Sequence, residues 1–193
     1  MELTVDINAI FRQAKEVLAA PRNFFAKAKK EKDWKKAFVF VLVAAAVGHV
    51  LTAVYNIFIY PLLAPSISEV IGVPASGFDA GQVVVAAIIS YILTLGMSFI
   101  WGAALKVWLM LFRVNSDFSS AYRVMAYSRT PNYLFSWLPV VNIAAALYSF
   151  YLLMLGLETQ YSMSRKKTIL VLVSSIVAVA LLSLLVVSFL PTF

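Results

Sequence analysis

The sequence has no cysteine and a single histidine, His49. Disulfides, thiolate chemistry and cysteine-based metal sites are therefore excluded, and one histidine cannot build a zinc site alone. Charged residues make up only 13% of the chain, and no acidic residue lies well inside an apolar segment. The H-E-x-x-H, G-x-S-x-G and P-loop motifs are absent as well. We therefore expect a protein that is not an enzyme and that uses no metal or cofactor.

Apolar residues dominate the composition. Of the 193 residues, 62% are hydrophobic, and the mean hydropathy is +0.88. Soluble domains are about 45–50% apolar and about 25% charged. The composition therefore predicts an all-α, multi-pass membrane protein, located in the cell membrane.

The apolar residues are gathered in long segments, and a helix needs about 20 of them to cross a bilayer. A fifth, more polar segment, 119–138, lies between the second and third of these. Pro61 and Pro65 are expected to end the first segment. The four strongly apolar segments are 37–63, 82–112, 140–157 and 168–190.

The positions of the basic residues favour five spans rather than four. Nine Lys and Arg residues precede the first span, the connection 64–81 has none, and 165–167 holds three. Basic residues concentrate in cytoplasmic connections. Only if 119–138 also crosses the membrane do both basic clusters lie on one side. We therefore predict a bundle of five transmembrane helices (37–193), with a cytoplasmic N-terminus and an extracytoplasmic C-terminus.

Residues 1–36 form a separate basic segment. Ile7, Phe11, Ala14 and Leu18 recur at helical spacing, which predicts a cytoplasmic amphipathic helix over about 5–19. Basic side chains and aromatic rings follow it and suit the anionic headgroup layer, although a partner-docking arm is an alternative. The net charge of +7 follows from this topology and requires no nucleic acid. The expected headgroup contacts are Arg22, Lys27, Lys29, Lys30, Lys35 and Lys36.

The segment 119–138 carries polar residues that are unusual in a span. Arg123 lies near its entry, whereas Arg129 lies about 9 Å deeper and should face the bundle interior, a cavity or a lipid phosphate. Pro131 should free the carbonyl of Tyr127 and kink the helix near Arg129. Asn132, Ser128, Thr130 or a water could then satisfy that carbonyl.

A tight turn joins this segment to the next, so the two should form an antiparallel hairpin. Residues at equal depth then have numbers that sum to about 279. This register predicts an Arg123–Glu158 ion pair, and Arg129 stacked on Tyr148 or Tyr151. Three roles remain open for these arginines: fixing helix depth, binding an anion or lipid headgroup, or lining a conduction path.

Two features of the first two spans concern helix packing. His49 follows Gly48 and is expected to bond a neighbouring helix, with titration as the alternative. Ser98 and Gly102 form a small-xxx-small pattern, which lets another backbone approach closely.

These residues resemble a known family, the Yip (Ypt-interacting) membrane proteins. The basic lead contains a P-x-x-F-F element, and the polar span contains an A-Y-x-x-x-A-Y-x-x-x-P element. The first is Pro21, Phe24 and Phe25, and the second is Ala121, Tyr122, Ala126, Tyr127 and Pro131. The resemblance implies a non-enzymatic, five-span membrane protein. Eukaryotic members associate with Rab GTPases and vesicle budding, but this chain has no D-L-Y-G-P element and no long N-terminal cytosolic domain. Its short format resembles prokaryotic members.

Two functions follow from the sequence. The first is a membrane-organising or trafficking-type scaffold that binds anionic lipids and other membrane proteins, with homo-oligomerisation left open. The alternative is a small anion or proton transporter or channel with a polar path lined by Arg129, Tyr127, Asn132 and His49.

Overall fold

The computed structural model describes residues 6–71 and 79–189, and all regular elements within these ranges are helices. Four helical segments are long and apolar enough to cross a membrane, namely Lys35–Ser66, Ala80–Leu111, Pro139–Tyr161 and Arg165–Leu185. The expected all-α, multi-pass membrane architecture is therefore confirmed. The elements are α1 (Ile7–Ala19), α2 (Pro21–Ala28), α3 (Lys35–Val54), the π-helix η1 (Tyr55–Ile59), α4 (Tyr60–Ile71), α5 (Ala80–Leu111), α6 (Phe118–Ser128), α7 (Thr130–Phe135), α8 (Pro139–Tyr161) and α9 (Arg165–Phe189).

Side chains that cap helix N-termini explain where several helices begin. Asp6, Asp79 and Asp117 precede α1, α5 and α6, and each accepts a hydrogen bond from a backbone N–H of the first turn. At α5 the side chain of Gln82 completes a capping box. Pro21 opens α2, where its missing N–H leaves no intrahelical bond unmade.

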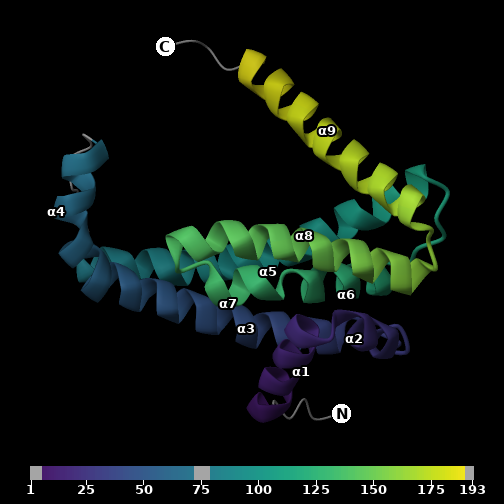
Figure 1. Cartoon of the computed structure of the whole chain (residues 1–193), viewed down its shortest axis with the longest axis horizontal. Helices are drawn as coiled ribbons and strands as arrows, with labels where there is room; N and C mark the ends of the chain where they lie inside the picture. The colour runs from purple at the N-terminus through teal and green to yellow at the C-terminus, as the bar shows by residue number, and fades with distance from the viewer. Residues whose placement is uncertain (1–5, 72–78, 190–193) are drawn as a thin grey trace.

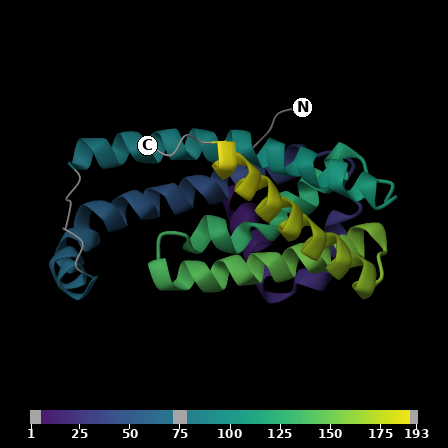
Figure 2. The same cartoon turned by 90° about the horizontal axis from the view of Figure 1, so that it is seen from above.

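The segment 119–138 does not form one long helix. It divides into α6 and α7 at Arg129, and neither piece alone is long enough to span a bilayer. Together they lie at the centre of the fold. α6 packs against α3, α5 and α8, while α7 packs against α3 and α8. Figure 2 shows them between α5 and α8. The five-span count stays a prediction.

The first apolar segment continues past both prolines, contrary to expectation. Pro61 lies in the first turn of α4, and Pro65 lies inside that helix. Pro61 cannot donate to the carbonyl four residues earlier, Ile57, which lies in η1. The wider π-helical turn absorbs this missing bond, so the chain bends instead of ending its helix. Figure 1 shows α4 turned away from the direction of α3.

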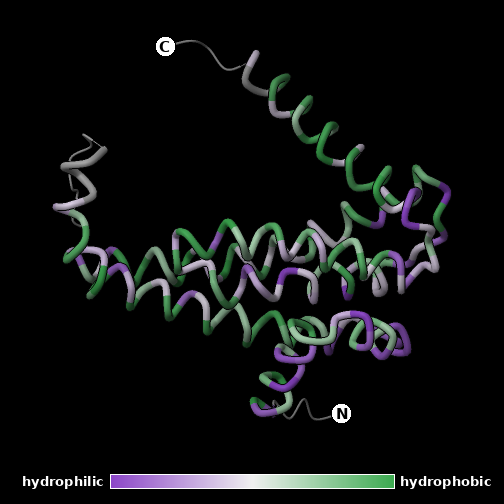
Figure 3. The backbone as a smooth tube through the Cα atoms, viewed as in Figure 1, coloured by the Kyte–Doolittle hydropathy of each residue, from purple (hydrophilic) through white to green (hydrophobic). Residues whose placement is uncertain are grey.

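Hydrophilic residues gather in α1, α2 and at one end of the bundle, as Figure 3 shows. We call this end the polar end and define it by the connections 29–34, 112–117 and 162–164. α5 and α8 run toward it, and α6 and α9 run away from it. α9 then diverges from the rest of the bundle (Figure 1).

Two close helix crossings depend on glycine. A Cβ on Gly102 would lie 2.9 Å from the Tyr122 ring and 3.2 Å from its Cα, so the close approach predicted for the Ser98–Gly102 pattern is confirmed. A Cβ on Gly48 would lie 1.8 Å from the carbonyl oxygen of Tyr133. α3 and α7 therefore touch backbone to backbone at this point.

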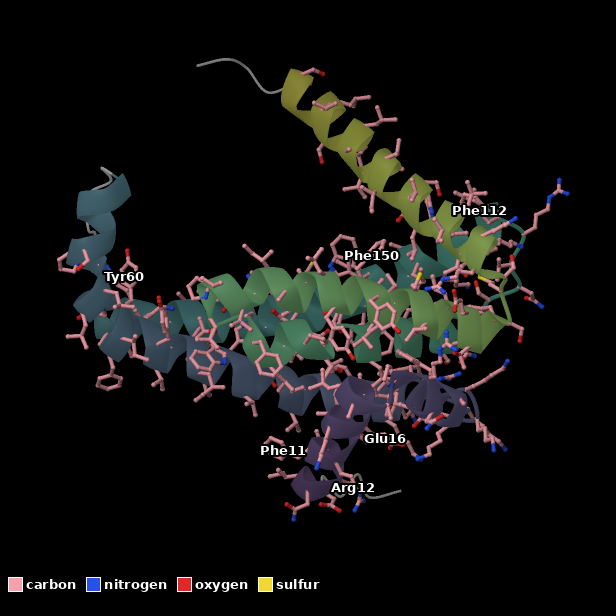
Figure 4. The ribbon with its side chains drawn as sticks, viewed as in Figure 1. Phe11, Arg12, Glu16, Tyr60, Phe112 and Phe150 are labelled. Carbon is pink, nitrogen blue, oxygen red and sulfur yellow. The ribbon has the colours of Figure 1, made fainter. Side chains whose placement is uncertain are left out.

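The helix α1 forms where the periodicity predicts a helix, but it buries a different set of residues. Ile10, Ala14 and Val17 are buried, whereas Ile7 and Phe11 are exposed. Figure 4 shows Phe11 on the part of α1 that projects from the bundle. The apolar side chains of α1 therefore lie on two faces of the helix. One face packs against the rest of the protein, and the other is exposed. Its position at a membrane surface stays a prediction.

Candidate functional site

The most deeply buried part of the protein is α6, the helix that carries the tyrosine-rich element. Ala121, Tyr122 and Tyr127 are completely buried, and Ala126 nearly so. The Tyr122 ring stacks on Phe99 of α5 at 5.0 Å between centroids, and its hydroxyl lies 3.0 Å from the Ser98 hydroxyl. The small alanines let neighbouring helices approach, while the tyrosines fill the space between them.

The P-x-x-F-F element packs directly against this helix. Phe24 meets the Tyr127 ring edge to face at 4.8 Å, and Phe40 of α3 meets the same ring at 5.3 Å. Phe25 lies against α8, because a Cβ on Gly156 would approach its ring to 3.0 Å. Both phenylalanines are buried. Two elements about 100 residues apart in sequence therefore form one apolar contact, which we call the motif contact (Phe24, Phe25, Tyr127 and Gly156).

Polar contacts extend the attachment of α2 along α8. Lys29 donates to the carbonyl of Thr159 at 3.1 Å and to the hydroxyl of Ser162 at 3.2 Å. In the last turn of α1, just before α2, the carbonyl of Leu18 accepts a hydrogen bond from the Tyr148 hydroxyl at 2.6 Å. These bonds fix the N-terminal segment on both sides of the motif contact.

A partly buried polar cluster joins α6 to the connection between α2 and α3. The Tyr127 hydroxyl donates to Glu31 Oε2 at 3.1 Å, and Arg123 Nη1 donates to the carbonyl of Asp33 at 3.4 Å. Arg123 is only 4% exposed, and its buried Nε has no hydrogen-bond partner. Burial raises the pKa of Glu31, although the Tyr127 hydroxyl and the charges of Lys36 and Arg123 oppose that shift.

The predicted register of the α6–α8 hairpin is confirmed. Three pairs agree with it to within two residues. These are Val124 opposite Gly156, the hydroxyls of Ser120 and Tyr161 at 2.9 Å, and Ser149 donating to Asn132 Oδ1 at 2.9 Å.

The predicted Arg123–Glu158 ion pair is wrong, although both residues lie near the expected depth. Val124 faces α8, and adjacent helical residues point about 100° apart. Arg123 is therefore directed toward Asp33 instead of α8. Glu158 Oε1 lies 4.0 Å from Arg165 Nε and accepts no hydrogen bond.

Arg129 forms the kind of contact that was predicted, but with another partner. Its guanidinium carbon lies 5.0 Å from the centroid of the Trp101 ring on α5. Tyr122 lies level with Phe99 on α5, and Arg129 lies two turns further from the polar end. The side chain therefore reaches back toward the polar end to meet Trp101, as expected for a cation that avoids the bilayer centre.

The two tyrosines expected beneath Arg129 stack on each other instead. The rings of Tyr148 and Tyr151 lie 5.9 Å apart and nearly parallel. Tyr151 is exposed, and the Tyr148 hydroxyl is engaged with the N-terminal segment. The aromatic partner of Arg129 is Trp101 instead.

The break at Pro131 agrees with the prediction. α6 ends at Ser128 and α7 begins at Thr130, so the helix is interrupted at Arg129. The carbonyl of Tyr127 accepts a hydrogen bond from the Thr130 hydroxyl at 2.6 Å. Thr130 was one of the partners expected for that carbonyl, and the Asn132 side chain is used by Ser149 instead.

His49 lies where α3 meets α5. Its Nδ1 is 2.8 Å from the carbonyl of Ala45, and its Nε2 is 3.4 Å from the Thr94 hydroxyl. The Tyr91 ring meets the imidazole edge to face at 5.7 Å. These contacts suit the helix-packing role.

Two of the basic residues expected to hold lipid headgroups are occupied within the protein. Lys27 forms an ion pair with Glu16 of α1, and Lys29 is bonded to the end of α8. The four others remain exposed without a recorded ion pair in the described ranges. They are Arg22, Lys30, Lys35 and Lys36.

A comparison with known protein families shows to which family the chain belongs. The sequence model of the Yip1 domain matches residues 15–187. The chain belongs to the Yip1-domain family. The match includes both halves of the motif contact. No curated protein and no solved structure matches the chain.

The sequence analysis missed several residues of this site in the Yip1 domain. Glu31 and Asp33 lie in a run of lysines, and two acidic residues in such a run are a signal for a contact with a buried cation such as Arg123. Trp101 gave no such signal, because an aromatic residue in an apolar span is common. Across residues 6–71 and 79–189 no three His, Asp or Glu side chains form a metal-binding group.

Proposed function

We propose that this Yip1-domain protein is a non-enzymatic membrane scaffold. It holds a basic surface against anionic lipid headgroups and presents apolar helix faces to lipids and to other membrane proteins. Membership of the Yip1-domain family supports an integral membrane protein of this kind.

The observation that carries the proposal is that Arg129, Asn132 and His49, three of the side chains expected to line a path, are engaged in helix packing. Arg129 is stacked on Trp101, and the Asn132 oxygen is bonded by Ser149. His49 contacts Ala45 and Thr94 of two adjoining helices. Groups used in this way stabilise helix contacts and are not free to coordinate a moving ion.

Charge on the surface of the N-terminal segment supports lipid binding. Arg22, Lys30, Lys35 and Lys36 are exposed, and each basic residue near an anionic membrane contributes about 1 kcal/mol. The uncovered Phe11 of α1 can enter the headgroup layer beside them, as aromatic residues of interfacial helices do.

The proposal includes five crossings, with α6 and α7 together as the third. Their 11 and 6 residues, joined through Arg129, have a combined length of about 27 Å along a helix axis. With this crossing, the basic segment before α3 and the residues Arg165, Lys166 and Lys167 share one side, which the positive-inside rule makes cytoplasmic.

Flux measurements test the scaffold against the transporter. We expect purified protein in sealed liposomes to leave proton and small-anion leakage equal to that of empty liposomes, from about pH 5 to about pH 8. An Arg129→Ala variant should behave in the same way. Flux above the empty-liposome level that changes in Arg129→Ala would refute the scaffold and make Arg129 a pathway residue.

Labelling of single cysteines tests the topology, since the natural chain contains none. Lys30→Cys and Lys166→Cys should react with an impermeant maleimide from one side of a sealed membrane. Val140→Cys, at a position that is 83% exposed, should react only from the other side. Labelling of Val140→Cys from the same side as Lys30→Cys, with Lys166→Cys labelled only from the other side, would show that α6 and α7 do not cross.

A further inference from the structure

A polar pocket lies at the polar end, between the end of α5, the end of α8 and the start of α9. Its volume is about 460 Å³. Arg113, in the connection after α5, and Lys167, in the first turn of α9, provide cations, and Ser162 and Ser164 provide hydroxyl groups. Arg113 and Lys167 are exposed, and no ion pair is recorded for either in the described ranges. Their charges are therefore available to an anion.

An apolar groove lies on the membrane side of this pocket, between α5, α8 and α9. It has a volume of about 260 Å³. Trp101 and Trp108 of α5 line one wall, Leu153 of α8 and Met125 of α6 contribute the floor, and α9 forms the other wall. The Trp108 indole donates to the carbonyl of Val171 at 3.0 Å, which fixes α9 to α5 at the end of the groove nearest the pocket.

Pocket and groove are adjacent on one face of α9. The residues of α9 that line them are spaced by three or four positions, which places them in a single stripe, Lys167, Val171, Ser175, Ala178 and Leu182. One helical turn, about 6 Å, separates Lys167 from Val171. Nearby Met110, Leu111, Ile169 and Leu170 are exposed apolar residues, as expected where a bilayer begins.

This combination matches one kind of molecule. A cationic pocket with hydroxyl groups suits a phosphate group. An apolar groove on the same face of α9 suits a hydrocarbon chain. Neither a soluble phosphate nor an unmodified apolar helix would use both parts. The two volumes together fall within the range of about 300–1,000 Å³ that is common for small-molecule sites.

We propose that the cleft between α5, α8 and α9 binds one anionic phospholipid, with its phosphate between Arg113 and Lys167 and an acyl chain along Trp108, Ser175 and Ala178. The inference rests on the proposed scaffold function and deepens it, since it assigns lipid class and position. It places lipid recognition away from the N-terminal segment, at the start of the last helix. Figure 4 labels Phe112 beside this start of α9.

Quenching of tryptophan fluorescence by chain-brominated lipid reads out this site. The chain has four tryptophans, and Trp34→Phe with Trp137→Phe leaves the two that line the groove. The protein is reconstituted in phosphatidylcholine vesicles containing a small fraction of brominated phosphatidylglycerol or brominated phosphatidylcholine. We expect stronger quenching by phosphatidylglycerol at equal mole fraction.

Charge variants test the polar half. Loss of one cation should lower the relative affinity for phosphatidylglycerol about fivefold, since each basic residue near the surface contributes about 1 kcal/mol. This is expected for Arg113→Gln and for Lys167→Gln, whereas Lys167→Arg should retain the preference. Lys166→Gln is the matched control, because it removes the same charge from the neighbouring residue outside the stripe. An equal loss of relative affinity in Lys166→Gln would show that only the general surface charge matters, and it would contradict a specific phosphate site.

Size variants test the apolar half. Ala178→Phe fills the groove and should lower quenching by brominated phosphatidylglycerol, whereas Ala180→Phe, at an exposed neighbouring position, should not. Equal effects of the two variants would contradict occupation of the groove by an acyl chain.

Further outcomes identify other occupants. Binding of inorganic phosphate that is weakened in Lys167→Gln, together with equal quenching by the two brominated lipids, would show a phosphate site without a lipid. Loss of quenching as the protein-to-lipid ratio rises would show that a second copy covers the groove. Equal quenching by the two lipids would reject the lipid site and leave the scaffold standing, whereas flux in the liposome assay would reject the scaffold and leave the quenching result unchanged.

Discussion

Replacing Gly48 by alanine tests the backbone contact between α3 and α7. The added Cβ would lie 1.8 Å from the Tyr133 carbonyl oxygen and 3.0 Å from its carbonyl carbon. Carbon and oxygen atoms in close contact are normally about 3.3–3.6 Å apart. Because the obstructing atoms belong to the backbone, no side-chain rotation relieves the clash, and the two helices must separate by about 1.5 Å.

The magnitude follows from overpacking, which destabilises by about 1–3 kcal/mol. A clash with backbone belongs at the upper end of that range. For a chain of this length each kcal/mol lowers the Tm by about 2–4 °C, so Gly48→Ala should lower it by about 6–12 °C. The assay is thermal unfolding in one detergent, followed by circular dichroism.

Two matched variants make the test sharp. Gly96→Ala adds the same atom where nothing lies within 4 Å, and its higher helix propensity should leave the Tm unchanged or raised. Gly102→Ala should fall between the two, because its nearest obstacle is a side-chain atom of Tyr122 at 2.9 Å. A Tm for Gly48→Ala equal to or above that of Gly96→Ala would refute the close crossing.

Three further predictions concern the polar contacts. Tyr127→Phe removes the hydrogen bond to the Glu31 carboxylate and should destabilise the docked N-terminal segment by about 1–2 kcal/mol. The measurement is amide hydrogen exchange over residues 21–34, which should become faster. The control, Tyr151→Phe, should leave this exchange unchanged. Because burial raises the pKa of Glu31 in the folded protein above its usual 4.5, docking of this segment should be firmest below about pH 4.5 and weaken as the pH rises through the raised value. Glu31→Gln should remove this pH dependence from amide exchange rates that are corrected for the intrinsic effect of pH. A pH dependence that is unchanged in Glu31→Gln would contradict the role of Glu31. A double-mutant cycle of Arg129→Gln and Trp101→Leu should give a coupling of about 0.5–2 kcal/mol, and independent effects of the two changes would exclude the cation–π contact.

The sequence predicted the hairpin register because a short turn leaves little freedom. α7 and α8 are joined by three residues, 136–138, so depth along α6, α7 and α8 follows from counting. Rotation about the helix axis is not set in this way. An error of one residue turns a side chain by about 100°, which is why Arg123 was placed at the correct depth and with the wrong partner.

Partners across longer connections were harder to predict. α5 and α6 are separated by six residues, 112–117. A loop of this length does not determine how far α5 is shifted relative to α6 along the helix axes. Sequence reasoning therefore found the type of contact that Arg129 makes but not Trp101. The bend at η1 was also missed, since Pro61 and Pro65 indicate a break without indicating that a π-helix can carry the chain through it.

The family elements were recognised in the sequence, but their contact with each other was not. Short separated patterns give no distance, and Phe24 and Phe25 have equally good apolar environments in lipid. Only the fold shows that they lie on Tyr127 and Gly156.

The most direct test of the account is a crosslink beside the motif contact in intact membranes. Lys29→Cys with Ser162→Cys replaces two side chains that lie 3.2 Å apart in a chain without other cysteines. We expect a short bis-maleimide to join them within one molecule. The yield should fall when Phe25→Ala is added, and remain when Phe11→Ala is added on the exposed side of α1. Absence of the crosslink in folded, inserted protein, or a yield indifferent to Phe25→Ala, would contradict the docking of the N-terminal segment on α8 through Phe25.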